Sequence, residues 1–213
     1  IENLENDASK VVYEIKGKER IDEAVVVLMA VGRTARTEIV EDNTIGITYG
    51  KRGIEVDENM QTSVPHIYAI GDVNGLCQLA HAATFQGRRA LNHILGRKDN
   101  IRFDLIPSAV FTSPQLASVG LREEDVTEHK PLVYKSFYRA NGRALSMDAD
   151  EGFLKIVCNE EGRVLGVHIM GEQASELIHE ATVLMNLGGT ISQLGDIIHA
   201  HPTLSEMYRA AVS

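Results

Sequence analysis

The stretch that decides the fold reads GFLKIVCNEEGRVLGVHIM at residues 152–170. Two apolar runs flank Glu160-Glu161-Gly162, whose composition is that of a hairpin turn. In the second run Val167 and Ile169 alternate with His168, which is the period of a strand in a sheet with one covered face. We therefore predict an antiparallel sheet built around this hairpin.

Further elements of the same sheet lie on both sides of the hairpin. Strands are predicted at residues 108–112, 116–121 and 132–138. A helix is predicted from Ala174 to Leu187, because its apolar residues form one stripe and Gly188-Gly189 follow it. A short helix should start at Thr190. From Ile101 onward the expected fold class is α+β, an antiparallel sheet with helices on one face.

The C-terminal helix is preceded by His199-Ala200-His201-Pro202-Thr203-Leu204-Ser205-Glu206. Pro202 favours an extended conformation at His201. Thr203, with Glu206 three residues later, predicts a capping box on a helix from Leu204 to Val212. The His201 imidazole would then leave the chain just ahead of a helix, within reach of the Glu206 carboxylate. Such a pair can accept and donate a proton.

Simpler interpretations of these residues stay open. Glu206 can serve as a capping residue and nothing more. His199 and His201 can be two partly exposed polar residues at a turn. No metal site is predicted, because a His-x-His pair without a third ligand nearby does not bind zinc.

The same eight residues resemble the C-terminal catalytic motif of the dihydrolipoamide dehydrogenases, flavin enzymes of the pyridine nucleotide–disulfide oxidoreductase family. The resemblance implies that His201 is an acid/base and that Glu206 orients it. It also implies that His201 faces a redox disulfide on the partner subunit. Residues 111–120 resemble the interface domain of that family, so the resemblance implies a homodimer.

Composition limits the function classes. The 213 residues carry a formal charge of −9, which argues against nucleic-acid or anionic-membrane partners. No window is apolar enough to span a bilayer. Cys77 and Cys158 lie far apart in no metal or redox spacing, so we expect reduced thiols and a cytoplasmic protein. The chain starts at Ile1 in charged sequence, and we expect it to be part of a longer protein.

The first hundred residues alternate strand and turn patterns. A β-hairpin is predicted over residues 1–31, with strands at 11–15 and 21–31, and the second strand ends at Gly32. Short strands are predicted at 53–57 and 66–70. The latter stops on Gly71-Asp72, a pair that also closes many turns. A helix is predicted from Leu79 to Leu95, ended by Gly96.

By resemblance, these segments belong to the family's cofactor sites. Gly32 would lie where the chain leaves the NAD domain, near the nicotinamide nucleotide. Gly71 and Asp72 would stand at the flavin, with Asp72 taking a ribitol hydroxyl of FAD. The backbone of Leu79, Ala80 and His81 would face the pyrimidine edge of the isoalloxazine, where a helix N-terminus offers free N–H groups and positive charge.

The resemblance implies three parts. They are the tail of an NAD-binding α/β domain at 1–31, the C-terminal segment of an FAD-binding α/β domain at 32–100, and an interface domain at 101–213. The sequence contains no Gly-x-Gly-x-x-Gly and no pair of nearby cysteines. We therefore expect this chain alone to bind FAD weakly, if at all, and to be inactive.

The resulting functional hypothesis is a homodimeric dihydrolipoamide dehydrogenase that uses FAD and NAD⁺. Its substrate would be the dihydrolipoyl group of a 2-oxo acid dehydrogenase complex. Two alternatives stay open, a reductase for glutathione or another disulfide, and an isolated dimerisation module without catalytic function.

Overall fold

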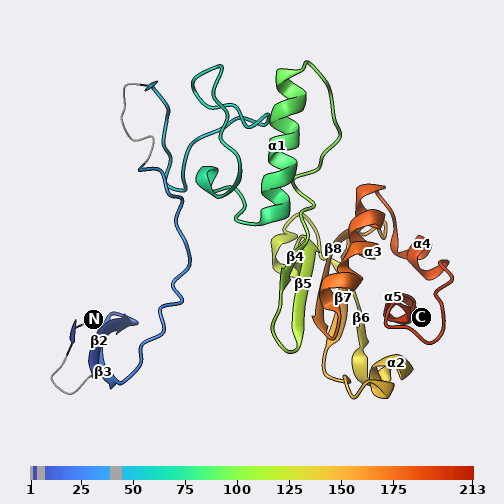
Figure 1. Cartoon of the computed structure of the whole chain (residues 1–213). Helices are drawn as coiled ribbons and strands as arrows, with labels where there is room; N and C mark the ends of the chain where they lie inside the picture. Colours follow the sequence, from blue (N-terminus) through green and yellow to red (C-terminus); the bar gives the residue numbers. More distant parts are fainter. Residues whose placement is uncertain (1, 4–7, 39–44) are drawn as a thin grey trace.

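A computed structural model describes residues 2–3, 8–38 and 45–213 (Figure 1). Parts of the predicted first hairpin, at residues 1 and 4–7, lie outside the described residues. The main body is a five-stranded antiparallel sheet in the order β4-β5-β8-β7-β6. Its strands are β4 (Ser108–Val110), β5 (Gln115–Gly120), β6 (Leu132–Phe137), β7 (Phe153–Cys158) and β8 (Val164–Gly171). All five predicted strands are confirmed, with ends that differ by one or two residues.

The central hairpin of β7 and β8 sets the register of the sheet. Ile156 pairs with Val167, and Leu154 pairs with Ile169. These four side chains are at most 2% exposed, so they form one buried face. The opposite face carries half-buried residues such as His168, as the period-two pattern predicted.

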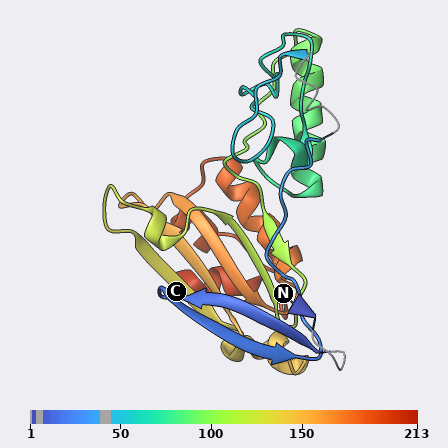
Figure 2. The same cartoon turned by 90° about the vertical axis from the view of Figure 1, so that its left-hand side faces the viewer.

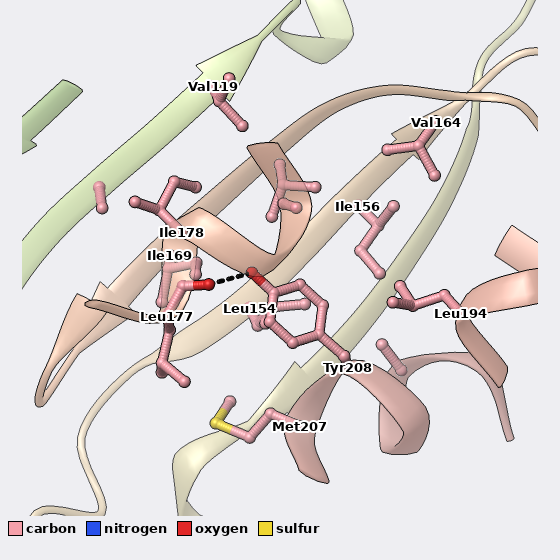
Figure 3. Close-up of a cluster of buried hydrophobic side chains, with 14 of the residues drawn as sticks. Val119, Leu154, Ile156, Val164, Ile169, Leu177, Ile178, Leu194, Met207 and Tyr208 are labelled. Carbon is pink, nitrogen blue, oxygen red and sulfur yellow. Dashed lines mark hydrogen bonds between the residues drawn. The ribbon is translucent and has the colours of Figure 1, made fainter. Parts of the chain in front are cut away.

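Helices cover the buried face. They are α2 (Gly142–Ser146), α3 (Ala174–Asn186), α4 (Ile191–Gly195) and α5 (Glu206–Val212). α3 lies against β5 and β8, and α5 lies against β6 and β7. Ile178 of α3, Leu194 of α4 and Tyr208 of α5 meet in one hydrophobic cluster (Figure 3). Each such buried side chain contributes about 1.5–3 kcal/mol, so this cluster holds the helices on the sheet. The α+β fold class is confirmed.

Short 3-10 helices connect these elements. They are η2 (Gly71–Asn74), η3 (Glu123–Asp125) and η4 (Tyr138–Ala140). Before the sheet, α1 (Ala80–Ile94) confirms the predicted helix. In both views α1 stands at one end of the sheet (Figures 1 and 2).

The predicted second strand at 21–31 is wrong in its extent. A small sheet contains β1 (Glu2–Asn3), β2 (Ser9–Ile15) and β3 (Lys18–Ala24), and β3 ends at Ala24. Beyond it the chain is unpaired as far as Gly32, and Val25, Leu28 and Val31 are 79–88% exposed. Their pattern is that of a buried strand, but the described residues supply no neighbouring strand to pair with it.

Two other predicted strands, at 53–57 and 66–70, are also wrong. Each is reduced to an isolated bridge, Tyr49 with Ile54 and Gln61 with Tyr68. Backbone groups nearby bond within turns instead. The Asp57 carboxylate, for example, accepts from the Gln61 N–H at 2.9 Å. Apolar alternation alone therefore overestimated the pairing of this region.

A fixed connection joins α1 to the sheet. Arg89 of α1 donates to Asp99 at 2.9 Å and to the Ile101 carbonyl at 2.8 Å. Asn92 donates to the same carboxylate at 2.9 Å. The His81 ring, in the first turn of α1, lies 2.7 Å from the Pro107 carbonyl just before β4. These contacts fix the direction in which the chain enters the sheet.

Candidate functional site

The structure pairs His201 with Glu206. Nδ1 of His201 lies 3.0 and 3.2 Å from the two Glu206 oxygens. An ionised carboxylate only accepts hydrogen bonds, so Nδ1 carries the proton. The other ring nitrogen, Nε2, has no partner among the described residues, and the His201 side chain is 81% exposed. The ring therefore presents a free lone pair to the outside of the molecule, as a general base must.

Glu206 has a second contact that keeps it in place. Its carboxylate accepts from the Thr203 backbone N–H at 2.8 Å. This hydrogen bond, followed by the one to His201, lowers the pKa of Glu206 below its ordinary value. The carboxylate is therefore anionic at neutral pH and stabilises a proton on the imidazole.

The predicted cap of the last helix is wrong in one half. The Thr203 hydroxyl donates back to the Ala200 carbonyl at 2.7 Å instead of capping the helix. α5 consequently starts at Glu206 and not at Leu204, and its N-cap Ser205 makes no side-chain cap. The reciprocal half, from Glu206 to the Thr203 N–H, is present. The Thr203 hydroxyl closes the turn that carries His201, because a Thr side chain can reach the backbone carbonyl three residues earlier.

Buried hydrogen bonds hold α5 and this turn on the sheet. The Tyr208 hydroxyl donates to the Leu177 carbonyl of α3 at 2.7 Å (Figure 3). The Ser136 hydroxyl of β6 donates to the Met207 carbonyl at 2.8 Å. Asn141 donates to the Thr203 carbonyl at 3.0 Å. A short helix fixed at these points can hold a catalytic pair in one geometry.

A second group of predicted residues meets at the start of α1. Gly71 has φ +75°, and its N–H donates to Gln86 of α1 at 2.6 Å. The Asp72 side chain is 51% exposed, with the Arg33 guanidinium 3.7 Å from its carboxylate. Asp72 thus keeps acceptor capacity for a hydroxyl group.

Leu79, Ala80 and His81 form the first turn of α1. Leu79 is the N-cap and provides no side-chain cap, so the first N–H groups have no capping side chain. The His81 ring contacts the Pro107 carbonyl. The expectation that the backbone of these residues faces a ligand stays a prediction.

Gly32 is connected to this cluster by the next residue in the chain, Arg33. The Arg33 guanidinium donates to the Gln78 carbonyl at 3.0 Å, directly before Leu79. Gly32 has φ +92°, and a Cβ there would meet nothing within 4 Å. A cavity of about 650 Å³ adjoins the group, lined in part by Arg33, Lys51 and Gln78. Three segments distant in sequence are thus brought together here.

The two groups are separate within this chain. His201 and Glu206 make no hydrogen bond or ion pair to residues 71–81 in the described part of the chain. Figure 1 shows α5 against the sheet and α1 at the other end. A site that needs both groups would therefore need a second copy of the chain.

Sequence reasoning missed the role of His199. Its side chain is only 6% exposed, and Nε2 lies 2.7 Å from Glu180 of α3. The interpretation as a partly exposed turn residue left out this contact: the residue is half-buried, and its ring is inserted against α3. The available signal was Glu180 itself, a carboxylate one residue from Ala181 on the apolar stripe of its helix.

The two cysteines are free thiols. Cys158 is fully buried in the sheet, and burial raises its pKa to about 11. Burial also raises the pKa of Cys77, which is half-buried. In the described residues, no cluster of three or more His, Cys, Asp or Glu side chains is arranged to bind a metal ion. No helix in the described part of the chain could cross a membrane.

Comparison with known proteins identifies the family. The model described as pyridine nucleotide-disulphide oxidoreductase, dimerisation domain, matches residues 106–212. A second model, pyridine nucleotide-disulphide oxidoreductase, matches residues 1–87. The chain belongs to the pyridine nucleotide-disulphide oxidoreductase family. The first model covers β4 to α5, so the antiparallel sheet with its helices is the dimerisation domain of this family.

Relatives and solved structures agree with this assignment. The chain is 38% identical over 212 residues to the dihydrolipoyl dehydrogenase of Chlamydia trachomatis, covering 98% of this chain and 45% of the relative. It is 40% identical over 205 residues to that of Bacillus subtilis, covering 94% and 44%. The chain therefore spans less than half the length of these relatives.

Two solved structures resemble the fold closely. LpdA of Mycobacterium tuberculosis matches with a TM-score of 0.82 at 31% identity, over 91% of this chain and 43% of that one. RclA of Escherichia coli, described as an HOCl-induced flavoprotein disulfide reductase, matches with a TM-score of 0.83 at 26% identity. That match covers 99% of this chain and 48% of RclA.

Proposed function

We propose that this chain forms the C-terminal part of an FAD- and NAD⁺-dependent dihydrolipoyl dehydrogenase, in which His201 is the acid/base. The observation that carries the proposal is the His201–Glu206 pair, with Nδ1 3.0 Å from the carboxylate and the ring 81% exposed. The identity of 38–40% to dihydrolipoyl dehydrogenases supports the choice of substrate class. The substrate would be the dihydrolipoyl group of a 2-oxo acid dehydrogenase complex.

The proposed step is a proton transfer. A dithiol attacks a disulfide only as a thiolate, so one substrate thiol must lose its proton. Nε2 of His201 accepts that proton, and Glu206 stabilises the resulting imidazolium through Nδ1. The thiolate then attacks a protein disulfide, so that the dithiol is oxidised and the protein disulfide is reduced by two electrons. Bound FAD and NAD⁺ supply the electron-accepting chemistry.

The residues at the start of α1 fit a flavin nucleotide. The first turn of α1 lacks a capping side chain and so offers N–H donors. Asp72 is an exposed acceptor suited to a ribitol hydroxyl. Gly71, the buried residue before it, has φ +75°, which favours glycine, and a Cβ there would lie 3.1 Å from Ala83, tighter than an ordinary contact. The predicted contact of this chain with NAD is the backbone at Gly32, which has open space beside it.

We further propose the division into residues 1–31 from an NAD-binding domain, 32–100 from an FAD-binding domain, and 101–213 as the interface domain. The proposed enzyme is a homodimer, because His201 and the start of α1 lie apart within one chain. The disulfide and flavin served by His201 then belong to the other subunit.

The His201→Gln change in the full-length enzyme tests the proposal. Loss of the proton acceptor should lower kcat for dihydrolipoamide oxidation by about 10²- to 10⁴-fold. His66→Gln is the matched control, because His66 is an exposed histidine in a distant turn. A His201→Gln enzyme as fast as the control would remove the acid/base assignment.

A second candidate is a flavoprotein disulfide reductase acting on another disulfide. The match to RclA over 99% of the chain favours it. The two candidates differ in substrate. Comparing kcat/KM of the full-length enzyme for lipoamide and for glutathione disulfide, each reduced with NADH as the electron donor, separates them, and the first proposal requires a clear preference for lipoamide.

A further inference from the structure

The loop ahead of His201 is anchored by one buried side chain. Ile198 is 97% exposed, whereas the His199 side chain is 6% exposed. Nε2 of His199 lies 2.7 Å from Glu180 Oε1. In this fully described segment, no other side chain of residues 196–200 makes a hydrogen bond. His199 is therefore the side chain whose hydrogen bond ties this loop to α3, while the N–H groups of Asp196 and Ile197 bond back to the end of α4.

The partner helix also anchors the chain after His201. Glu180 and Leu177 are three residues apart on α3, so they share one face of the helix. The Leu177 carbonyl accepts from Tyr208, seven residues after His201. α3 is itself fixed in the core by Ile178 and Ala181, each 1% exposed. One rigid helix thus holds the chain on both sides of His201.

Contacts after His201 hold its turn on the sheet from one side, because Asn141 donates to the Thr203 carbonyl at 3.0 Å. The Thr203 hydroxyl and the Glu206 carboxylate connect the turn to itself and to α5. They set the His201 ring relative to α5. The direction in which the chain enters the turn is set by the residues before it, and the contact of His199 with Glu180 fixes those residues.

We propose that the part-buried His199–Glu180 pair is a positioning device that sets the direction of His201 by fixing the preceding loop on α3. The inference rests on the proposed function of His201 as the acid/base. His199 and Glu180 themselves do not touch the reacting groups. They act through the main chain at residues 199–201.

A purely stabilising role explains the pair poorly. Nδ1 of His199 is buried without a partner among the described residues. An unsatisfied buried polar atom destabilises the folded state, and an apolar side chain at this position would avoid that cost. Such departures from good packing are expected where a geometry is needed for function.

The test uses the full-length enzyme and a double-mutant cycle. His199→Phe keeps a ring but loses the donor to Glu180, and should lower kcat for dihydrolipoamide oxidation about 10-fold with KM for NAD⁺ unchanged. His199→Gln places an amide N–H near the position of Nε2, and should restore kcat to within about twofold. Asp196→Asn, on the same loop, is the control and should have no effect.

The decisive variant combines His199→Phe with His201→Gln. If His199 acts only through His201, the double variant is no slower than His201→Gln alone, so His199→Phe causes no loss once His201 is replaced. If His199→Phe caused the same fold loss with His201 present and with His201→Gln, the inference would be overturned. A His199→Phe enzyme as fast as the Asp196→Asn control would also overturn it, and so would a failure of His199→Gln to restore kcat. Full activity of His201→Gln alone would overturn the proposed function and this inference with it, so the two failures are distinguishable.

Discussion

Two carboxylates in this chain are kept anionic by different surroundings. Glu206 is held by a backbone N–H and by His201, whose exposed ring can exchange a proton with a substrate. Asp99 is held by a guanidinium, an amide and a backbone N–H, and its side chain is 12% exposed. The arrangement at Glu206 suits proton transfer, and the arrangement at Asp99 suits a permanent structural link.

The Asp99 link gives a prediction about pH and stability. The hydrogen bonds from Arg89 and then Asn92 lower the pKa of Asp99 from 3.8 to about 2. A carboxyl with a depressed folded-state pKa stabilises the fold fully above its unfolded pKa, and loses that contribution as the pH falls toward the folded value. Asp99→Asn should therefore lower the free energy of unfolding at pH 7 by about 1–2 kcal/mol.

The difference from the unchanged chain should shrink as the pH falls from about 4 toward 2. Urea unfolding between pH 7 and pH 3 measures it. Asp104→Asn is the matched control, because Asp104 pairs with Arg102 in the same linker but is 63% exposed. It should change stability by less than about 0.5 kcal/mol. An Asp99→Asn effect of equal size at every pH would contradict the linkage.

At the scale of elements, α5 is too short to be stable by itself. Its seven residues depend on docking, and Tyr208 is 0% exposed with its hydroxyl 2.7 Å from the Leu177 carbonyl. Burial raises the pKa of this hydroxyl far above its ordinary value, so it is a neutral donor. The helix that carries Glu206 is therefore attached to α3 by one aromatic side chain and its hydrogen bond.

Removing the hydroxyl and removing the ring should have separable effects. Tyr208→Phe should lower the free energy of unfolding by about 1 kcal/mol, and Tyr208→Ala by about 3–5 kcal/mol. Tyr134→Phe, a half-buried residue of β6, is the control and should change stability by less than about 0.5 kcal/mol. Urea unfolding measures all three. Equal stability of the Phe and Ala variants would show that the ring is not packed as the structure has it.

The elements that the sequence predicted well are those whose signals are local. The β7–β8 hairpin combines period-two alternation with a turn, and α3 combines an apolar stripe with a terminal Gly-Gly. The errors arose where a competing or missing partner decides the outcome. The Thr203 hydroxyl bonds to the nearby Ala200 carbonyl instead of capping its helix. Residues 25–31 have strand composition, but the described residues supply no strand to pair with them.

The candidate site was predictable to the same extent. The pair of His201 and Glu206 lies within six residues, so the sequence revealed it. The burial of His199 depends on Glu180, which is 19 residues earlier. Glu180 lies beside the apolar stripe of its helix, but a glutamate usually stays exposed, so this signal alone could not pair it with His199.

At the scale of the whole molecule, the proposed function implies that this chain holds only part of a flavin site. It has an uncapped helix start and Asp72, but the sequence has no glycine-rich motif to bind a pyrophosphate. We expect the isolated chain to bind FAD with a Kd weaker than about 100 μM, whereas the full-length enzyme should retain flavin through gel filtration. Quenching of flavin fluorescence during titration measures this. Stoichiometric binding of FAD by the isolated chain would contradict it.

Association of the chain is the second whole-molecule property, and exposed apolar side chains in two parts of the chain compete to explain it. In the dimerisation domain, Leu187 and Ile198 are 81% and 97% exposed. In the unpaired segment after β3, Leu28 is 88% exposed. Contiguous exposed apolar side chains mark association sites, but a single solvated strand promotes non-specific aggregation rather than a closed pair.

We therefore expect the chain to form a dimer through its dimerisation domain. Ile198→Asp should raise the dimer dissociation constant at least about 10-fold, because a charge would be buried without a partner. Leu28→Asp is the matched control, an equally exposed apolar residue outside the domain, and should leave the dimer intact. Light scattering after gel filtration at several concentrations measures both. If Leu28→Asp dissociates the dimer and Ile198→Asp does not, the interface lies on the unpaired segment, and the two-subunit site proposed for His201 loses its geometric basis.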